Sequence, residues 1–227
     1  MLTILPYDLP DARMLRAGSD RVDTKVFVPD RVMVVVGRGS DPEHELHVES
    51  VLADSVPVYR RETGGCAVVL SHQMLVVALA LRSASPQPPL PYFRLFNELL
   101  QRALVRAGII GVEPAGTSDL AIRGRKISGS SLYRGRDLVF FHAVINVDGD
   151  VSLMERYLRF PPRQPAYRNG RPHRDFVGSL AAHGFSLDAT AFSRYVDDDF
   201  QTLVSRVAAG QAAGTEAVPL APVPPVT

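Results

Sequence analysis

The sequence predicts an α/β (α+β) protein with mixed, largely antiparallel sheets and packed helices. Short apolar, β-branched runs end at glycine or at polar turns, which is typical of strands, and segments with apolar residues at helical spacing lie between them. Hydrophobic residues make up 46% of the 227 residues, enough to form a packed core. Strands mixed with a few helices favour an α/β or α+β architecture.

Three strand regions follow one another along the chain. The run "RVMVVVG" (31–37) is apolar and ends at a glycine. The runs "CAVVL" (66–70) and "MLVVALAL" (74–81) are separated by Ser-His-Gln, which predicts a bend or hairpin between buried strands. Residues 119–147 alternate short apolar runs with "RGR", "SGS" and "RGRD", which predicts a meander of strands with glycine-containing turns.

Three helices are expected between and after these strands. The linker "PQPPLP" (86–91) precedes apolar residues at helical spacing, with Pro91 in the first turn and Gly108 as the stop. "SLME" (152–155) is a Ser-x-x-Glu capping box that would open a short helix through Leu158. A last helix is expected from after Asp188 to about Ala208. Residues 1–209 then form a single domain, and residues 210–227 form a disordered Pro/Ala-rich tail.

The overall composition narrows the class of partner. The net charge of +1 argues against a strongly basic nucleic-acid-binding protein. The single cysteine, Cys66, cannot form an internal disulfide, which fits a reducing compartment. The first residues are apolar for only five positions before Pro6, too short for a signal or a membrane span. We therefore expect a cytoplasmic protein with no membrane or nucleic-acid partner.

The stretch "RRETGGCAV" contains a candidate ligand cradle. Gly64 and Gly65 let the backbone approach a ligand, and consecutive N–H groups in such a turn can form an anion nest. Arg60 and Arg61 could offer forked donors to a phosphate or carboxylate. The alternative is a tight turn flanked by solvated arginines.

The stretch "GRKISGSS" contains a second candidate. Lys126 follows an expected hairpin turn and leads into Ser128, Gly129 and Ser130. A lysine beside small hydroxyl-bearing residues can neutralise a phosphate or polarise a carbonyl. The alternative is a lysine on an edge strand that discourages aggregation.

Other polar residues are weaker candidates. None of the histidines His72, His142, His173 and His183 has metal spacing with a second histidine or cysteine, so no metal site is expected, and His142 fits a hydrogen-bonded sheet histidine. "VDDDF" (196–200) fits a solvated acidic face, with a cation site as the less favoured reading. Six arginines from Arg156 to Arg174 form a candidate docking surface for an acidic partner, unless they are simply solvated.

Taken in order, four stretches resemble the lipoate-protein ligase and octanoyltransferase family, whose catalytic domain is of the biotin/lipoate A/B protein ligase type. These stretches are "VMVVVGRGSDP" (32–42), "RRETGGCAVV" (60–69), "SDLAIRGRKISGSS" (118–131) and "FFHAVINVDGDVSLMERYLR" (140–159). The resemblance covers roughly residues 30–205, and it implies that residues 1–209 are one lipoate-ligase-like catalytic domain.

The resemblance implies a role for each matching residue. Lys126 would bind the acyl carbonyl and phosphate, Asp119 would face the adenylate, and His142 would close the site. The residues expected to bind substrate are Arg60, Arg61, Thr63, Gly64, Gly65, Ala67, Asp119, Ser128, Gly129, Ser130 and His142.

The sequence departs from the family pattern at the loop. Cys66 stands where the family has a third glycine, and the histidine that usually follows is absent, with His72 two residues beyond its place. The amidotransferase branch carries its nucleophilic cysteine before the "DL" strand, where this chain reads "VEPAGTSDL". Cys66 is thus the only candidate nucleophile for a thioester route, with His72 or Lys126 as helper; otherwise it is a packing residue.

The resemblance implies a ligase that attaches a lipoyl or octanoyl group to a specific lysine of a lipoyl-carrier protein through lipoyl-adenylate. The carrier would be a glycine cleavage H protein or a 2-oxoacid dehydrogenase lipoyl domain. ATP or lipoyl-AMP and lipoate or octanoate would be bound, with Mg2+ as a candidate ion, and a separate accessory subunit is a candidate partner. The alternatives are a Cys66-dependent octanoyl or lipoyl transferase and a non-catalytic lipoyl- or adenylate-binding partner of a ligase.

Overall fold

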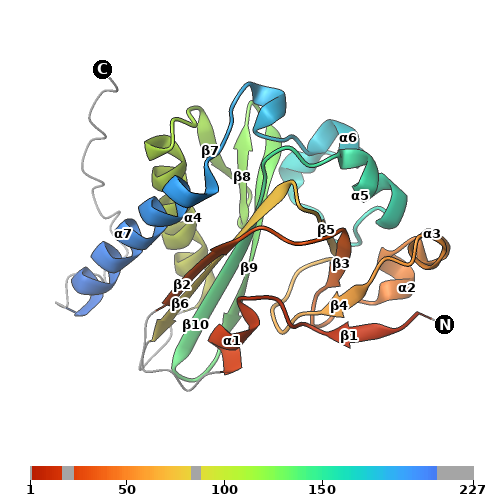
Figure 1. Cartoon of the computed structure of the whole chain (residues 1–227), viewed down its shortest axis with the longest axis horizontal. Coiled ribbons are helices and arrows are strands. Elements are labelled where there is room, and N and C mark those ends of the chain that lie inside the picture. Colours follow the sequence, from red (N-terminus) through yellow and green to blue (C-terminus); the bar gives the residue numbers. More distant parts are fainter. Residues whose placement is uncertain (1, 17–22, 83–87, 209–227) are drawn as a thin grey trace.

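A computed structural model describes residues 2–16, 23–82 and 88–208, which form two sheets packed face to face (Figure 1). The larger sheet is antiparallel throughout, in the order β2-β6-β10-β9-β8-β7. Its strands are β2 (Asp23–Phe27), β6 (Met74–Arg82), β7 (Val112–Ala115), β8 (Asp119–Ile122), β9 (Arg125–Arg134) and β10 (Leu138–Asn146).

The smaller sheet is mixed, in the order β1-β4-β3-β5. Strand β4 pairs in parallel with both β1 and β3, while β5 is antiparallel to β3. The strands are β1 (Ile4–Pro6), β3 (Met33–Val36), β4 (Val58–Arg60) and β5 (Val68–Leu70). Two largely antiparallel and mixed sheets with packed helices confirm the predicted fold class.

Side-chain alternation explains why the central strands are apolar on both faces. On β6 and β10, one set of alternating side chains packs against helices α4 (Pro89–Arg106) and α7 (Ala189–Ala208), in the largest core cluster. The other set faces the smaller sheet, where Met74 and Val76 pack with Val35. In the four-layer arrangement of Figure 1, the outer face of the smaller sheet is covered by α2 (Pro42–Glu45), α3 (Val48–Ala53) and α5 (Val151–Tyr157).

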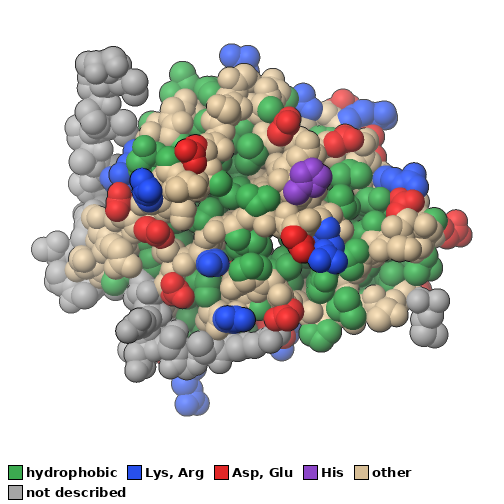
Figure 2. Space-filling model, in the orientation of Figure 1, with side chains coloured by type: hydrophobic (Ala, Val, Ile, Leu, Met, Phe, Trp, Pro, Cys, Tyr) green, Lys and Arg blue, Asp and Glu red, His purple; other side chains and the backbone are tan. Residues whose placement is uncertain are grey.

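Shorter elements complete the fold around the contact between the sheets. They are helices α1 (Ala12–Arg16) and α6 (His173–Phe176) and two 3-10 turns, Ala166–Arg168 and Ala181–His183. Within the described parts of the chain, no helix is both long enough and apolar enough to span a membrane. Figure 2 shows acidic and basic side chains interspersed over the face of Figure 1.

Most of the expected elements are present. The meander over residues 119–147 is confirmed as β8, β9 and β10, and the last helix as α7. The helix after the proline-rich linker begins at Pro89 and ends at Arg106, just before the predicted stop. The predicted tail 210–227 lies outside the described residues.

Of the bend or hairpin predicted between the runs 66–70 and 74–81, the bend is present, since Met74 N donates to the carbonyl oxygen of Ser71. The hairpin is not, because β5 pairs with β3 in the smaller sheet and β6 pairs with β2 and β10 in the larger one. One other local prediction is wrong. Ser152 does not cap α5. The cap is Asp150, whose carboxylate accepts a hydrogen bond from the backbone N–H of Ser152.

Candidate active site

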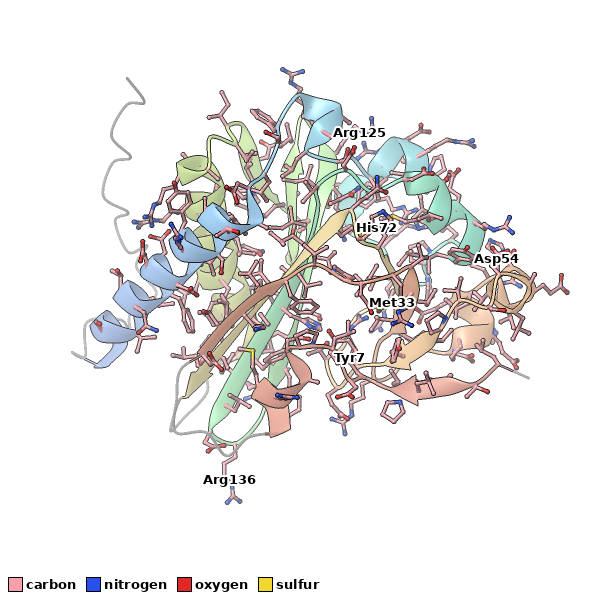
Figure 3. All side chains as sticks on the ribbon, in the orientation of Figure 1. Tyr7, Met33, Asp54, His72, Arg125 and Arg136 are labelled. Carbon is pink, nitrogen blue, oxygen red and sulfur yellow. The ribbon has the colours of Figure 1, made fainter. Side chains whose placement is uncertain are left out.

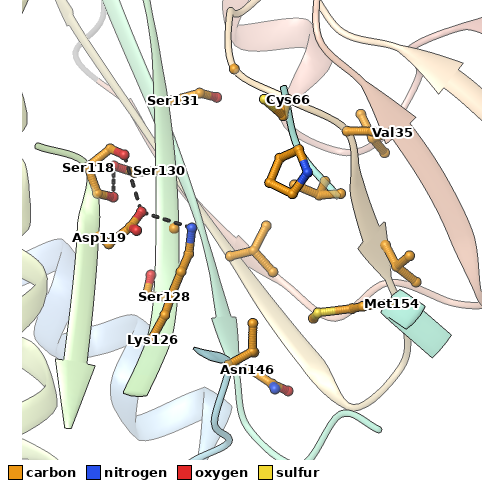
Figure 4. A pocket seen from close by; sticks show the side chains of 18 of the residues that line it. Val35, Cys66, Ser118, Asp119, Lys126, Ser128, Ser130, Ser131, Asn146 and Met154 are labelled. Carbon is orange, nitrogen blue, oxygen red and sulfur yellow. Dashed lines mark hydrogen bonds and ion pairs between the residues drawn. The ribbon is translucent and has the colours of Figure 1, made fainter. Parts of the chain in front are cut away.

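A cavity of about 420 Å³ lies between the two sheets. One part is polar, with Asp119, Lys126 and the serines of β9, and Figure 4 shows these residues across the cavity from Val35, Cys66 and Met154. The other part is apolar, and its walls come from both sheets and from α5. The apolar lining includes Val35, Leu70, Met74, Val76, Val144 and Met154.

A β-bulge directs Lys126 into the polar part. The register between β8 and β9 shifts beside Leu120, so that Ile127 is an extra residue on β9. Ile127 packs into the core, and the half-buried Lys126 amine forms an ion pair with Asp119 Oδ1 at 2.9 Å. The backbone of Lys126 is held from the other side, because its carbonyl accepts a hydrogen bond from Gly178 N at 2.9 Å. Lys126 is therefore a fixed cation in the cavity and not an edge-strand lysine.

Asp119 is oriented by three donors. Besides Lys126, Ser118 Oγ donates to Oδ1 at 3.2 Å, and the Tyr167 hydroxyl donates to Oδ2 at 2.8 Å. Burial and the charge of Asp119 raise the pKa of Tyr167 well above its ordinary value, so the phenol keeps its proton and remains a donor. Both carboxylate oxygens are thus engaged, and the position of the Lys126 amine is defined.

Arg61 binds the backbone of the glycine loop, the loop that contains Gly64 and Gly65. It is 5% exposed, and its guanidinium donates to the carbonyl oxygens of Val35, Gly64 and Cys66 at 2.8–3.2 Å. Burial lowers the pKa of Arg61 to about 10, which still leaves the side chain charged near neutral pH. Its donors therefore hold the loop backbone and do not project as a free fork toward a ligand.

Glu45 also holds this loop, while Arg60 holds the neighbouring loop of residues 37–40. Arg60 Nη1 donates to the carbonyl oxygens of Gly37, Arg38 and Ser40, so this guanidinium also binds backbone instead of projecting toward a ligand. The buried carboxylate of Glu45 accepts a hydrogen bond from Ala67 N at 2.5 Å and lies near enough to Arg61 to favour its charge. The backbone of the expected cradle is therefore held by hydrogen bonds to the side chains of Arg61 and Glu45, and the cradle is not a turn with solvated arginines.

His142 belongs to a buried relay of hydrogen bonds. Its Nδ1 lies 3.1 Å from Asp11 Oδ2, and its Nε2 lies 2.9 Å from Thr63 Oγ1, which is itself 2.9 Å from Ser131 Oγ. Burial lowers the pKa of His142, so the neutral ring is favoured. With an ionised Asp11, Nδ1–H donates to the carboxylate and Nε2 accepts from Thr63. His142 is thus a hydrogen-bonded sheet histidine whose face lines the cavity.

Cys66 is a partly exposed residue of the cavity wall. Its Sγ lies 3.8 Å from the carbonyl oxygen of Arg163, a weak contact. Among the described residues, no histidine or carboxylate is hydrogen-bonded to this sulfur. The proposed helper His72 is exposed and does not line the cavity.

The two charged stretches are largely used within the fold. In the arginine stretch, Arg156 pairs with Asp54, and Arg171 donates to the carbonyl oxygen of Gly124. Arg168 is buried between the rings of Phe160 and Phe176, at 4.5 and 4.9 Å from their centroids. Four of the six arginines, Arg156, Arg159, Arg163 and Arg174, are nevertheless exposed, so the docking surface for an acidic partner stays a prediction.

The acidic stretch is also paired. Asp198 and Asp199 both bind Arg106, at 3.1 and 2.9 Å, which joins α7 to α4. In the described ranges of the chain, no three His, Cys, Asp or Glu side chains come together as metal ligands. Asp198 and Asp199 of "VDDDF" therefore join the two helices, while Asp197 accepts a hydrogen bond from Thr24 Oγ1 of β2.

The structure brings most of the predicted site residues together. Those that line the cavity are Arg61, Gly65, Cys66, Ala67, Asp119, Lys126, Ser128, Gly129, Ser130 and His142. Arg60, Thr63 and Gly64 are not among the lining residues. Arg60 binds the carbonyl oxygen of Gly37, the carbonyl oxygen of Gly64 accepts from Arg61, and Thr63 binds His142. Tyr7, Asp11, Glu45 and Tyr167 lie in no recognisable motif, and Ser131 ends the stretch "GRKISGSS" but was not singled out.

The fold and the site together define a class: an α+β protein with a cavity that has a cationic, hydroxyl-rich part and an apolar part. Residues 11–201 match the family model described as the lipoyl protein ligase A/B catalytic domain, and the chain belongs to that family. The resemblance found in the four sequence stretches is thereby confirmed.

Two curated relatives carry ligase names. A lipoate–protein ligase of Streptococcus pyogenes serotype M5 (strain Manfredo) is 29% identical over 187 residues, which cover 77% of this chain and 53% of the relative. A probable lipoate-protein ligase A of Mycoplasma pneumoniae (strain ATCC 29342 / M129 / Subtype 1) is 30% identical over 128 residues, covering 55% of this chain and 36% of the relative. The chain spans about half or less of the length of these relatives.

Solved structures share the fold at low sequence identity. A bi-partite lipoate protein ligase from Thermoplasma acidophilum, studied with its E2 lipoyl domain, superimposes with a TM-score of 0.72 at 18% identity, covering 90% of this chain and 84% of that chain. A lipoate-protein ligase A bound with ATP gives a TM-score of 0.73 at 16% identity, covering 90% and 85%.

Proposed function

We propose that this chain attaches a lipoyl or octanoyl group to a specific lysine of a lipoyl-carrier protein, using an acyl-adenylate made from the free acid and ATP. The observation that carries the proposal is the Lys126 amine, paired with Asp119 and held at the polar part of a cavity whose other part is apolar. An acyl-adenylate has the matching shape, an anionic phosphate joined to an apolar chain.

The polar part suits the charge that develops during transfer. When the acceptor amine attacks the acyl carbonyl, a C–N bond forms, the C–O bond to AMP breaks, and the amine loses a proton to solvent. Negative charge grows on the carbonyl oxygen and stays on the departing phosphate. A fixed ammonium such as that of Lys126 stabilises both, with Ser128 and Ser130 lining the same part of the cavity.

The apolar part suits the chain of the acid. Val35 and Met154 come from one side of the cavity, and Val76 and Val144 from the larger sheet on the other. Burying apolar surface of the ligand here contributes binding free energy in proportion to the area removed from water. A lipoyl or octanoyl chain is largely apolar, as this lining is, and would bury apolar surface against it.

The adenylate route is favoured over the thioester route by the surroundings of Cys66. A nucleophilic cysteine normally passes its proton to an adjacent base. The contact made by Cys66 Sγ is a backbone carbonyl oxygen, which cannot take the thiol proton to leave a thiolate, and His72 lies outside the cavity lining. We therefore assign Cys66 to the cavity wall as a packing residue and not as the nucleophile.

The proposal extends to partners by similarity. The bi-partite Thermoplasma ligase was studied with an E2 lipoyl domain, and another related structure contains bound lipoic acid. We infer a lipoyl domain or a glycine cleavage H protein as acceptor, with a second subunit as a candidate requirement for activation of the free acid.

Intact-protein mass spectrometry of the acceptor tests the proposal. The purified chain is mixed with an apo lipoyl domain and either octanoate plus ATP or chemically prepared octanoyl-AMP. Acylation with octanoyl-AMP supports the proposal, and acylation from octanoate plus ATP shows that no second subunit is needed. A hydroxylamine-labile adduct on Cys66 would establish the thioester route instead. Binding of octanoyl-AMP without acylation would identify a non-catalytic member.

A further inference from the structure

We propose that Tyr7 forms the end wall of the apolar part of the cavity and thereby limits the length of the acyl chain that the site accepts. The inference rests on the proposed function, because it assigns an acyl chain to this part of the cavity. Tyr7 lies four residues before residue 11, where the family match begins, and it lines the cavity.

Tyr7 belongs to the same core cluster as the apolar lining. It is 7% exposed and lines the cavity, and Figure 3 places it between the two sheets. The cluster joins side chains from both sheets to the N-terminal segment. Its members that also line the cavity are Tyr7, Val35, Val68, Leu70, Met74, Val76, Val144 and Met154.

The strand register separates Tyr7 from the Lys126 amine. A Cβ added to Gly129 would lie 2.6 Å from Lys126 Nζ, so the amine lies over Gly129, which pairs with Val144. His142 pairs with Ser131, two residues farther along, which corresponds to about 7 Å of strand. The ring of Tyr7 meets the ring of His142 edge-on, with centroids 6.2 Å apart. In the proposed binding mode, the chain is anchored at Lys126 and runs along β10 toward His142, where it meets Tyr7.

Tyr7 is held in place as a rigid wall. Its hydroxyl donates to Asp11 Oδ1 at 2.8 Å, and the other oxygen of this fully buried carboxylate binds His142. Burial and the charge of Asp11 raise the pKa of Tyr7, so the donor keeps its proton. A tightly packed and hydrogen-bonded ring does not yield to a longer ligand, because packed interiors resist deformation.

Isothermal titration calorimetry with straight-chain carboxylates of six to twelve carbons tests this inference. In the wild-type protein, affinity should rise by about fourfold for each added CH2 up to a limiting length and then fall at least tenfold. Tyr7→Ala should move the limit by two or more carbons toward longer acids. Tyr7→Phe keeps the ring and should keep the limit. Tyr59→Leu changes a residue of the same cluster that does not line the cavity, so it should also keep the limit.

The outcomes separate the two proposals. If the wild-type protein binds acids and Tyr7→Ala keeps the same limiting length, Tyr7 is not the end wall and the proposed function stands. If the wild-type protein binds none of the acids or their adenylates, both proposals fail. Tyr7→Leu retains apolar packing and replaces Tyr7→Ala if circular dichroism shows that the alanine variant is unfolded; an unchanged limit in Tyr7→Leu equally overturns the inference.

Discussion

The amine of Lys126 lies directly over Gly129. A Cβ at position 129 would come within 2.6 Å of Lys126 Nζ and 2.7 Å of its Cε, and 3.5 Å from Asp119 Oδ1. Glycine therefore provides the space in which the Lys126–Asp119 ion pair is formed. The "SGS" sequence has a specific physical purpose here, since its central residue must lack a side chain.

Gly129→Ala should lower the rate of acyl transfer by about 10²-fold, because the added methyl displaces the Lys126 amine by about 1 Å. The displaced group is the end of a flexible side chain, so the thermal midpoint should change little. Gly39→Ala is the matched control, since nothing lies within 4 Å of its added Cβ. Equal rates in the two variants would contradict this account of the site.

Lys126→Ala should reduce acyl transfer by about 10²- to 10³-fold, the effect of removing one preorganised electrostatic group from an active site. Transfer from octanoyl-AMP to a lipoyl domain provides the measurement. The chain has one other lysine, the exposed Lys25, and Lys25→Ala should retain full activity. Normal turnover in Lys126→Ala, with a folded protein, would exclude the assigned role.

Cys66→Ala should retain more than half of the transfer rate, because the sulfur contacts a backbone carbonyl at 3.8 Å and not a base. The rate with octanoyl-AMP is compared with that of the wild-type protein, and Cys66→Ser serves as a second variant that preserves size. Loss of transfer in both variants would favour a covalent role for the thiol.

Glu45→Ala should lower the free energy of unfolding by about 2 kcal/mol, because it leaves the buried N–H of Ala67 without its charged acceptor. It also removes a negative charge that favours the buried Arg61 guanidinium. Urea unfolding gives the measurement. Glu43→Ala, an exposed carboxylate on the same short helix, should change the free energy by less than about 0.5 kcal/mol.

Stability should fall as the pH decreases from about 6.5 to 4, and His173 should contribute to this fall. Burial, and then the charge of Arg168, lower the pKa of His173 to about 4. In this window the unfolded chain binds the proton and the folded chain does not, so acid favours unfolding. His173→Asn should make the dependence of the urea midpoint on pH shallower. His72→Asn, at an exposed site, should leave it unchanged.

The sequence predicted the meander over residues 119–147 because local signals determine it. Glycine-containing turns separate apolar runs there, and each strand pairs with its neighbour in the chain. At residues 66–81 a bend or a hairpin was expected; the bend is present, and the hairpin does not form for the opposite reason. Both runs are strands, but each meets partners from distant parts of the chain, and periodicity does not specify the partner.

The site was predictable where chemistry is concentrated in a motif. Lys126, Asp119 and the glycine loop were found in this way, and they do meet at the cavity. Arginines were harder to interpret, because the same guanidinium can bind a ligand or, as in Arg61, three backbone carbonyls. Tyr167 was missed because its role depends on a hydrogen bond across 48 residues of sequence.

The pairing of Asp11 with His142 joins positions 131 residues apart. During synthesis, an N-terminal segment that has left the ribosome contains Tyr7 as a local partner of Asp11, but it lacks His142 until β10 follows. The contact between Asp11 and His142, beside Tyr7 at the end of the cavity, is therefore among the contacts of highest sequence separation. Such contacts form slowly because a long loop must close first. A nascent chain that stops before β10 has no closed cavity, so a ligand can stabilise this protein only after most of the chain has been made.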